Sequence, residues 1–262
     1  MDAWSSGDLY EPYIGRWSRP VGREFVRWLE PEPARRWLDV GCGTGALSGV
    51  VLDNADPAAV IGVDPSPAYI EHARARLPES RVDLRVGDAL ALPVDDDAVD
   101  YVVSGLVLNF VPDPAAGLAE MIRTATGGAT IAAYVWDYGE GMQLIRQFWD
   151  AAVALDPAAA DRDEAVRFPL CRPGSLGRVF SDSGLTELQN TAIVVPTVFT
   201  SFDDYWSPFL GGDGPAPGYC AALSDDARRR LRDRLQATLP TQSDGSIHLT
   251  ARAWAAKGQT SA

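Results

Sequence analysis

Apolar runs of strand length alternate with helix-length stretches along the first half of the chain. Each run is built around apolar residues, and each is followed by a segment long enough for a helix. The runs are residues 35–40, 58–64, 81–88, 98–105 and 128–136. Near-continuous apolar strands are typical of a parallel sheet that helices cover on both faces. The pattern therefore predicts a βαβα order.

Two of the predicted helices carry specific start signals. Ser66 and Asp113 each supply a side-chain oxygen for the first turn, and each is followed by a proline suited to the first helical position. Further along, residues 184–199 and 245–258 look like two more strands, joined by an aromatic-rich segment. We therefore expect an α/β fold with a mostly parallel sheet and an antiparallel edge.

Length and composition fit one large domain. The chain has 262 residues, of which 46% are apolar, and this is enough to bury a full core. Segments rich in proline, glycine and aromatic residues occur between about 137 and 183 and between about 196 and 235. We therefore expect a single domain over residues 1–262, in which these two stretches are cap insertions.

Charge and hydropathy argue against a nucleic-acid partner and against insertion in a membrane. A formal net charge of −13 disfavours nucleic acid, because binding to its phosphate backbone needs clustered basic side chains. The densest basic stretch, residues 228–234, contains an aspartate and follows two others, which indicates an exposed helix face with local ion pairs. No apolar run is long enough to span a bilayer, and the N-terminus lacks a signal-peptide pattern. We expect a soluble, cytoplasmic protein without membrane insertion.

Cysteine and histidine usage gives little sign of a metal or a disulfide. The 3 cysteines are widely spaced, and none has a histidine at ligand spacing. Of the 2 histidines, His72 is expected on an exposed helix face, and His248 is expected as a packed or hydrogen-bonded core residue. We therefore expect no metal site and no histidine base.

The stretch WLDVGCGTG, residues 37–45, suggests a ligand site. Alternate glycines after a strand let a bound molecule approach the backbone and leave helix N-terminal amides pointing at it. A tight connection without a ligand and a turn that binds a nicotinamide or flavin dinucleotide are alternatives. Asp64 closes the next strand, where a ribose diol needs a carboxylate acceptor, although an N-cap role is the alternative for this residue.

Two further aspartates favour a ligand that carries a positive group. Asp39 lies just before the glycines, where a carboxylate would repel a pyrophosphate. Asp88 follows the third strand and has small apolar neighbours, an arrangement that can read an adenine amino group; the alternative is a turn cap. A cationic adenosine derivative therefore fits this set better than a dinucleotide.

Over roughly residues 10–136 the chain resembles the class I S-adenosylmethionine-dependent methyltransferases. The resemblance is carried, in order, by LDVGCGTG, GVDPSPAYIEHARARL and GDALALPVDDDAVDYVVSGLVLNFVPDP. Within that group it looks most like the small-molecule methyltransferases related to the ubiquinone and menaquinone biosynthesis enzymes. The resemblance implies a Rossmann-like, seven-stranded sheet in the order 3-2-1-4-5-7-6, with strand 7 antiparallel and helices on both faces.

The resemblance also implies a set of cofactor contacts. Asp39 would face the ammonium end of S-adenosylmethionine, Asp64 its ribose hydroxyls and Asp88 its adenine. The implied set is Asp39, Gly41, Cys42, Gly43, Asp64, Pro65, Ser66, Asp88, Ala89 and Ser104. Many relatives carry a histidine in the stretch after the fourth strand, whereas this chain has Asn109 there, so a histidine base from this position is unavailable.

A leading helix over about residues 8–30 would act as a lid, as it does in related small methyltransferases. Tyr10, Tyr13 and Trp17 share one helical face, and an aromatic ring beside a sulfonium contributes about 0.5 to 2 kcal/mol. Lid packing and cofactor contact are equal alternatives for Tyr13 and Trp17. Arg16 is a candidate partner for a carboxylate of the cofactor or of a neighbouring residue.

Methyl transfer from a sulfonium is an in-line displacement, in which positioning alone contributes on the order of 7 to 11 kcal/mol. On the resemblance, the end of the fifth strand faces the acceptor, and Asp137 is the candidate base or orienting carboxylate; a turn or N-cap role is the alternative. The predicted acceptor pocket comprises Trp136, Tyr138, Phe168, Phe202, Tyr205 and Trp206. A subdomain seam or a dimer contact is the alternative for the aromatic segment.

The sequence thus predicts a methyltransferase that uses S-adenosylmethionine, yields S-adenosylhomocysteine and acts on a small organic acceptor mainly by proximity and desolvation. One rival is an NAD(P)-dependent oxidoreductase, which Asp39 and the GDALALP segment oppose. The other rival is a noncatalytic cofactor-binding module whose aromatic cap is a protein interface. We expect a small-molecule partner and either a monomer or a homodimer.

Overall fold

The computed structural model describes residues 11–211 and 214–261. Tyr10 and the first positions of the predicted leading helix lie outside the described residues. The described part of this segment begins with a π-helical turn, η1 (Glu11–Gly15), and continues as α2 (Arg16–Leu29). A helix therefore leads into the first strand, as the sequence predicts.

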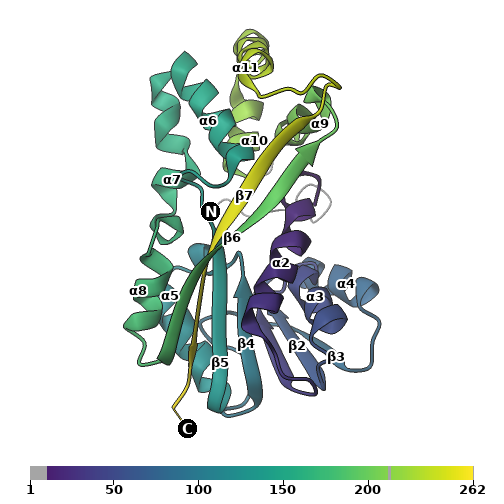
Figure 1. Ribbon diagram of the computed structural model, residues 1–262, viewed down its shortest axis with the longest axis vertical. Helices are drawn as coiled ribbons and strands as arrows, with labels where there is room; N and C mark the ends of the chain where they lie inside the picture. The colour runs from purple at the N-terminus through teal and green to yellow at the C-terminus, as the bar shows by residue number, and fades with distance from the viewer. Residues whose placement is uncertain (1–10, 212–213, 262) are drawn as a thin grey trace. The chain divides into compact units, whose positions relative to one another are not determined.

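Seven strands form one sheet in the order β3-β2-β1-β4-β5-β7-β6, with β7 antiparallel (Figure 1). They are β1 (Arg36–Val40), β2 (Ala59–Asp64), β3 (Val82–Val86), β4 (Val99–Gly105), β5 (Ala125–Trp136), β6 (Thr186–Phe199) and β7 (Ile247–Gln259). Parallel pairing of β1 with β2 and β4 places Asp39 opposite Gly62 on one side and Val103 on the other. The predicted fold class and strand order are confirmed.

The chain divides into two compact units. Of the described residues, unit 1 contains 11–17, 136–172, 194–211 and 214–252, and unit 2 contains 18–135, 173–193 and 253–261. Strands β6 and β7 contribute residues to both units. Most of the sheet therefore belongs to unit 2, and the segments predicted as cap insertions contribute mainly to unit 1.

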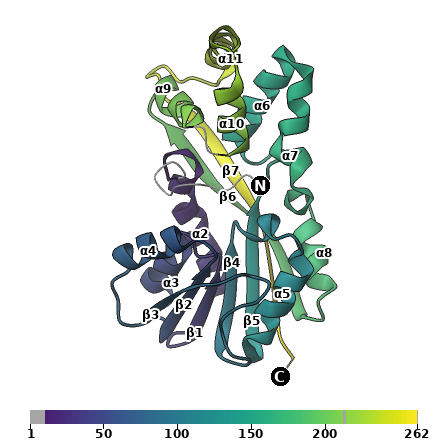
Figure 2. The same cartoon turned by 180° about the vertical axis from the view of Figure 1, so that it is seen from behind.

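In unit 2, helices cover both faces of the sheet (Figures 1 and 2). One face carries α2, α3 (Ala46–Asn54) and α4 (Pro67–Arg76), and the other carries α5 (Pro114–Arg123) and α8 (Ser175–Ser181). Helix α2 is anchored by Phe25, which is fully buried and packs on Tyr134 with ring centroids 4.6 Å apart. This two-sided cover explains why the central strands β1 and β4 are almost wholly buried, whereas the edge strand β3 buries only Leu84.

The predicted capping signals are confirmed in α4 and α5. Ser66 Oγ accepts the N–H of Tyr69, and Asp113 Oδ1 accepts N–H groups of the first turn of α5. The next residue in each helix is a proline, which has no N–H to satisfy and presets the helical φ. These caps set where the two helices begin after β2 and β4.

Unit 1 is built around an aromatic core. Its helices are α6 (Gln143–Leu155), α7 (Glu164–Arg167), α9 (Phe202–Trp206), α10 (Pro215–Ala222) and α11 (Asp225–Thr238). The buried ring of Phe209 contacts those of Tyr13, Phe148 and Tyr205, with centroids 5.4, 4.4 and 5.5 Å apart. Such pairs add about 0.5 to 1.5 kcal/mol each beyond burial, so the aromatic-rich segments stabilise this unit.

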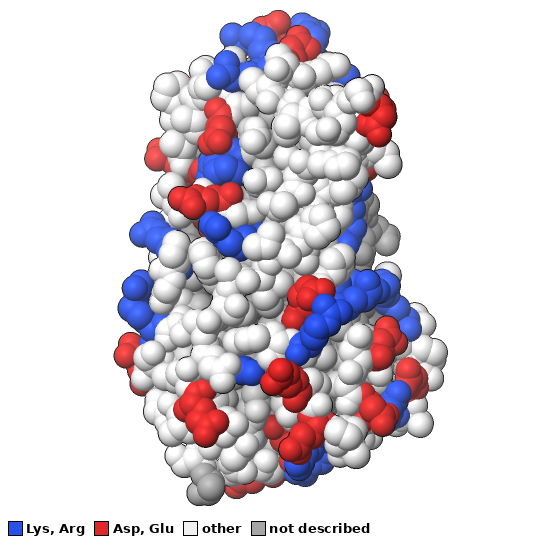
Figure 3. Space-filling view, viewed as in Figure 1, with Lys and Arg blue, Asp and Glu red and all other residues white. Residues whose placement is uncertain are grey.

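Charges of both signs mix along α11, at the top of Figure 3. Arg228 pairs with Asp225 at 3.4 Å, and Arg229 pairs with Asp226 at 3.3 Å. Exposed pairs of this kind contribute about 1 kcal/mol or less, so the helix is held mainly by buried residues such as Leu235. The prediction of an exposed helix face with local ion pairs is confirmed.

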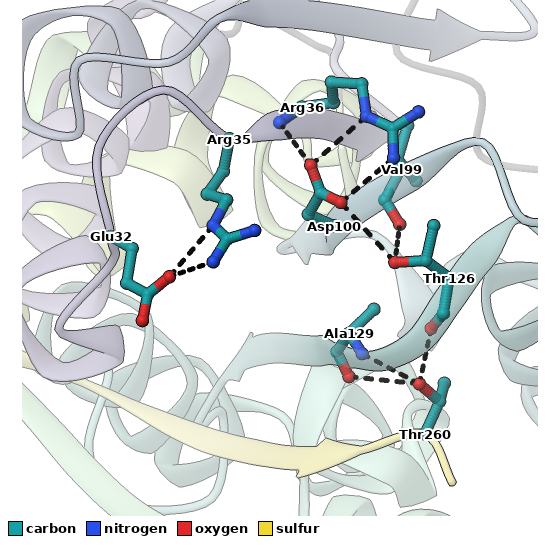
Figure 4. Close-up of polar contacts among 8 residues, drawn as sticks. All are labelled: Glu32, Arg35, Arg36, Val99, Asp100, Thr126, Ala129 and Thr260. Carbon is teal, nitrogen blue, oxygen red and sulfur yellow. Dashed lines mark hydrogen bonds and ion pairs between the residues drawn. The ribbon is translucent and has the colours of Figure 1, made fainter. Parts of the chain in front are cut away.

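Polar contacts tie together the amino-terminal ends of three strands in unit 2 (Figure 4). Arg36 holds Asp100 through Nε and Nη2, which face the two carboxylate oxygens at 3.2 and 3.0 Å. Thr126 Oγ1 donates to the Val99 carbonyl at 3.2 Å, and Thr260 Oγ1 donates to the Thr126 carbonyl at 2.7 Å. The amino ends of β1, β4 and β5 are thereby joined, and the predicted ligand-binding loops follow the opposite, carboxyl ends.

Candidate functional site

The glycines after β1 differ in what an added side chain would meet. All have positive φ, +76° at Gly41, +52° at Gly43 and +82° at Gly45, where other residues are strained by roughly 1 kcal/mol or more. A Cβ on Gly41 would overlap the side chain of Val107, and one on Gly45 would lie 2.8 Å from Leu77. A Cβ on Gly43 would meet no described atom within 4 Å. Packing therefore requires a glycine at Gly41, the positive φ favours one at Gly45, and Gly43 faces open space.

Asp39 is a buried carboxylate with one unused oxygen. The residue is 1% exposed, and its Oδ2 accepts a hydrogen bond of 2.7 Å from Ser48 Oγ. Its Oδ1 is buried and has no hydrogen-bond partner among the described residues. Burial raises the pKa of Asp39 to about 7, although the hydrogen bond from Ser48 opposes the rise. A cationic donor is the partner that such an oxygen prefers.

Asp64 ties the glycine turn to the end of β2. Its Oδ2 accepts the N–H of Gly43 at 3.0 Å, and its Oδ1 accepts the N–H of Ser66 at 2.9 Å. Burial raises the pKa of Asp64, and these backbone donors work against the rise. A carboxylate offers about four acceptor positions, so room for two hydroxyl donors remains. Pro65 is exposed beside it, and Ser66 is half-buried as the cap of α4.

Asp88 and Ala89 lie in a tight turn after β3. Asp88 Oδ1 accepts the N–H of Leu90 at 2.9 Å, and Asp88 forms an isolated antiparallel bridge with Ala91. Asp88 is exposed, and Ala89 is half-buried. The side chain of Asp88 thus caps a turn, which was the alternative role, and its contact with an adenine stays a prediction.

The carboxyl end of β4 combines a buried hydroxyl, a strained residue and an unpaired amide. Ser104 is fully buried and donates its Oγ–H to the Val40 carbonyl at 2.9 Å. Leu106 has φ +64°, which is rare for a bulky residue and marks strain of the kind that gathers at functional sites. Asn109 Nδ2 is buried without a hydrogen-bond partner in the described chain. Nothing in the sequence signals Leu106, because its backbone angle depends on tertiary contacts.

The side chain of Cys42 points away from the open side of the turn. It packs in an apolar cluster with Ile70, Ala73 and Leu84. Burial raises the pKa of the Cys42 thiol far above its usual value, so the thiol stays neutral. Any contact between Cys42 and a cofactor would therefore be made by its backbone.

Asp137, the predicted base, has both oxygens occupied. The residue is 1% exposed in unit 1, and its Oδ1 accepts the N–H groups of Gly139 and Glu140 at 3.1 and 3.2 Å. Its Oδ2 is paired with Arg252, whose Nε lies 2.7 Å away. Gly141 is required beside the pair, because a Cβ there would lie 2.8 Å from Oδ2. The alternative role in a turn is therefore present, and the role as a base stays a prediction.

The predicted pocket aromatics belong to unit 1, and several are interior residues. Tyr205 is fully buried and donates its hydroxyl to the Leu144 carbonyl at 2.9 Å. Trp206 is 5% exposed and stacks on Phe202 with centroids 6.4 Å apart. These contacts are those of a packed core, and a pocket role for the three rings stays a prediction.

The other predicted pocket residues are also in unit 1. Tyr138 packs against Phe168 with centroids 5.8 Å apart. Trp136 is 2% exposed, and its Nε1 has no hydrogen-bond partner within the described residues. A separate pocket of about 320 Å³ is lined by residues of α6, α10 and α11 together with Asp156 and Pro157, and Tyr219 is the aromatic residue in its wall. The sequence does not signal this pocket, because residues 152–157 and 219–231, which form its wall, lie far apart in the chain.

Tyr13 and Trp17 both pack on aromatic residues of unit 1. The ring of Tyr13 meets Phe209 with centroids 5.4 Å apart, and that of Trp17 meets Phe199 with centroids 5.6 Å apart. The packing alternative is therefore present for both residues, and a contact with the cofactor stays a prediction.

Glu164 was not expected from the sequence. It is 2% exposed at the start of α7, and its carboxylate accepts a hydrogen bond from Trp149 Nε1. Burial raises the pKa of Glu164 to about 7. Burial also raises the pKa of Tyr13, and the charge of Glu164 adds to that rise. A buried carboxylate beside an aromatic core is a candidate functional group. In the sequence, Glu164 follows the helix cap Asp163 and looks like an ordinary acidic residue of a first helical turn, so its burial is not evident.

Histidines, cysteines and membrane-spanning potential add little to the site. His72 is exposed, as predicted, whereas His248 is exposed instead of packed in the core, and its Nε2 lies 3.0 Å from Ser246 Oγ. Cys171 and Cys220 are buried thiols. Over the described ranges, no group of side chains is arranged to hold a metal ion, and no helix is both long and apolar enough to cross a membrane.

Comparison with known proteins agrees with this geometry. A family model described as a methyltransferase domain matches residues 38–133. An uncharacterized methyltransferase of Mycobacterium tuberculosis is 37% identical over 123 residues, and the match covers 47% of this chain and 47% of that protein. The chain therefore spans about half the length of that relative. A trans-aconitate 2-methyltransferase of Methylobacterium radiotolerans is 32% identical over 189 residues, which are 72% of this chain and 68% of that protein.

Solved structures share the fold at low identity. Phosphoethanolamine N-methyltransferase 2 of Haemonchus contortus, in complex with S-adenosyl-L-methionine, aligns with a TM-score of 0.60 at 15% identity, over 96% of this chain and 56% of that chain. The [4+2]-cyclase SpnF aligns with a TM-score of 0.55 at 17% identity, over 94% of this chain and 82% of that chain. These likenesses establish the fold alone.

The extended match to the trans-aconitate 2-methyltransferase, the methyltransferase-domain model and the strand order together define the class of this protein. The chain belongs to the class I S-adenosylmethionine-dependent methyltransferase family. Its predicted kinship with the ubiquinone and menaquinone enzymes within that family stays a prediction.

Proposed function

We propose that the protein transfers a methyl group from S-adenosylmethionine to a small organic acceptor and releases S-adenosylhomocysteine. The observation that carries the proposal is Asp39 Oδ1, a buried acceptor without a partner among the described residues. An unsatisfied buried acceptor costs about 1 to 3 kcal/mol, and an ammonium group is the donor that would satisfy it best. The methionine end of the cofactor carries such a group.

Two neighbouring features of unit 2 support the same ligand. The open space beside Gly43 leaves room for the methionine chain of the cofactor to lie along the backbone of the turn. The carboxylate of Asp64, held by the N–H groups of Gly43 and Ser66, keeps acceptor capacity for a ribose diol. An acceptor for a cation, an open stretch of backbone and an acceptor for a ribose thus follow one another along the ends of β1 and β2. The ammonium group, the methionine chain and the ribose have the same order in the cofactor.

The cofactor supplies an already activated methyl sulfonium, and the chain supplies orientation and exclusion of water. Positioning of two reactants contributes on the order of 7 to 11 kcal/mol, so a base is needed only for an acceptor that must lose a proton. Asp137 has both oxygens engaged in unit 1, which favours an orienting role over that of a base. Burial raises the pKa of Glu164 to about 7, so this carboxylate can exchange a proton near neutral pH.

Binding and transfer are tested separately. Thermal unfolding is followed with S-adenosylhomocysteine and with NADH, and transfer is followed with methyl-labelled cofactor and a panel of phenols, quinones, amines and carboxylic acids. We expect stabilisation by S-adenosylhomocysteine that Asp39→Asn removes and that the exposed-site control Asp53→Asn retains. Stabilisation by NADH alone would replace the proposal with an oxidoreductase.

A second candidate is a protein that binds the cofactor without transferring its methyl group. The fold alone does not decide between the two candidates, because the [4+2]-cyclase SpnF shares it over 94% of this chain. This candidate predicts binding of S-adenosylhomocysteine with no label on any acceptor. The cytoplasmic location and the choice between monomer and homodimer stay predictions.

A further inference from the structure

Arg16, the first residue of α2, uses only part of its guanidinium. Its Nη1 donates to Asp204 Oδ1 at 2.8 Å. Its Nε and Nη2 are buried, and neither has a hydrogen-bond partner in the part of the chain that the structure describes. A guanidinium has five N–H groups and no acceptor, and each buried donor left unpaired is unfavourable. The free edge therefore requires an acceptor from outside the described residues.

Nε and Nη2 lie on one edge of the guanidinium, and their N–H bonds point in the same direction. This edge matches the two oxygens of a carboxylate. Arg36 uses it to hold Asp100, at 3.2 and 3.0 Å (Figure 4). Arg123 uses it to hold Glu120, with both bonds at 2.8 Å. The same edge of Arg16 is unoccupied by any described side chain.

The guanidinium of Arg16 is held in place without a ligand. Its Cζ lies 4.6 Å from the ring centroid of Trp17 and 4.5 Å from that of Phe199. Asp204, which holds Nη1, is itself fixed by the N–H of Thr200 at 2.8 Å. Although burial acts to raise it, the pKa of Asp204 is lowered by the hydrogen bond from Arg16, so this carboxylate is ionised at neutral pH. The free edge is therefore preorganised.

Two more polar groups without partners lie around Phe199. Trp17 Nε1 is buried and unpaired among the described residues, and its ring contacts Phe199 with centroids 5.6 Å apart. Thr197 is fully buried and lies two residues before Phe199 on β6, so the two side chains share a face of the strand. Thr197 Oγ1 also finds no partner within the described ranges. All these residues belong to unit 1.

The unpaired groups are the Nε–H and Nη2–H of Arg16, the Nε1–H of Trp17 and the hydroxyl of Thr197. A set dominated by donors, with one cation among them, suits an anion. Since Asp204 already offsets part of the charge of Arg16, a planar carboxylate with a single charge fits better than a phosphate dianion.

We propose that Arg16, Trp17 and Thr197 form a binding site for a carboxylate of a small-molecule ligand. The proposal rests on the proposed function, because the ligand is either the methyl acceptor, which would then be a carboxylic acid, or the cofactor through its methionine carboxylate. The chemistry is the same for both sources, and matched probes distinguish them.

The test uses Arg16→Lys, which keeps a positive charge opposite Asp204 and loses the planar fork. The matched control is Arg19→Lys, at an exposed arginine of the same helix. Phenylacetate and its neutral amide probe the acceptor source, and S-adenosylhomocysteine and its decarboxylated analogue probe the cofactor source. Binding is measured by calorimetry, and thermal unfolding verifies that each variant is folded.

We expect Arg16→Lys to weaken one carboxylate probe by about tenfold or more, with its carboxylate-free counterpart unchanged. A loss for phenylacetate assigns the site to the acceptor, and a loss for S-adenosylhomocysteine assigns it to the cofactor. Arg19→Lys should bind every probe as the wild type does. Trp17→Phe, which keeps an aromatic ring and removes Nε1, should weaken the same probe more moderately, and it serves as the second variant if Arg16→Lys fails to fold.

The proposal is overturned if wild type prefers neither carboxylate to its neutral counterpart, or if folded variants bind both carboxylates with wild-type affinity. Failure of the proposed function looks different, because the wild type would then bind neither S-adenosylhomocysteine nor its analogue. The phenylacetate arm would still report on Arg16 in that case.

Discussion

The carboxylate of Asp137 and the guanidinium of Arg252 form an ion pair in unit 1, in which two guanidinium nitrogens contact one carboxylate oxygen. Both Nε and Nη2 of Arg252 point at Oδ2, at 2.7 and 2.6 Å. Asp137 is 1% exposed, whereas the side chain of Arg252 is 29% exposed. The pair therefore joins a buried turn after β5 to the more accessible middle of β7.

Arg252→Met should destabilise the protein, because it leaves a buried carboxylate without its counter-charge. We expect a loss on the order of 2 to 4 kcal/mol, measured by urea unfolding. Asp137→Asn should lower stability as well, and the double variant should lose less than the sum of the single variants, since the pair acts as a unit. A variant Asp137→Asn that keeps wild-type stability and loses transfer at saturating substrate would instead establish a chemical role for this residue.

Gly41→Ala and Gly43→Ala should fail in different ways. At Gly41 the new methyl group overlaps Val107, so we expect a loss of about 2 to 4 kcal/mol in unfolding free energy. At Gly43 only the positive φ is strained, and a loss of about 1 kcal/mol should accompany at least tenfold weaker binding of S-adenosylhomocysteine. Val107→Ala in the Gly41→Ala background should recover part of the lost stability. Wild-type affinity in Gly43→Ala would mean that the open space is not part of the cofactor site.

Cofactor affinity should depend on pH through Asp39. With a pKa of about 7, Asp39 is neutral below that pH and ionised above it. Since the ionised form attracts an ammonium group, affinity for S-adenosylhomocysteine should rise as pH increases through about 7. Calorimetry in buffers of different ionisation enthalpy should detect proton release on binding near pH 7. Asp39→Asn should bind weakly and lack the rise, and Asp53→Asn should keep it.

Glu164→Gln should stabilise the protein at alkaline pH. The folded-state pKa of about 7 lies above the unfolded value of about 4.3, so the neutral carboxyl favours folding at low pH and this contribution is lost as pH rises through 7. The glutamine can still accept the hydrogen bond from Trp149. At pH 8 we expect a gain on the order of 1 to 3 kcal/mol over wild type, shrinking towards pH 5. The exposed control Glu71→Gln should change little, and an equal gain at both pH values would contradict the assigned burial.

Local pattern alone was sufficient to predict the elements that carry the proposed cofactor site. The run at residues 58–64 became β2 (Ala59–Asp64), and the caps at Ser66 and Asp113 start helices where they were predicted. Strand periodicity and capping depend on near neighbours in the chain, which is why they can be read without a structure. The same holds for the glycine turn, because glycine adopts positive φ at no steric cost.

Tertiary packing decided which of these residues have unsatisfied groups. Arg252 lies 115 positions from Asp137, and Asp204 lies 188 positions from Arg16. No local pattern encodes such pairings, since they arise when distant segments bury each other. Packing thus occupied both oxygens of Asp137 and buried Glu164. The sequence determined the sheet and its glycine turn, and only the folded chain left Asp39 Oδ1 and one edge of Arg16 buried without a described partner.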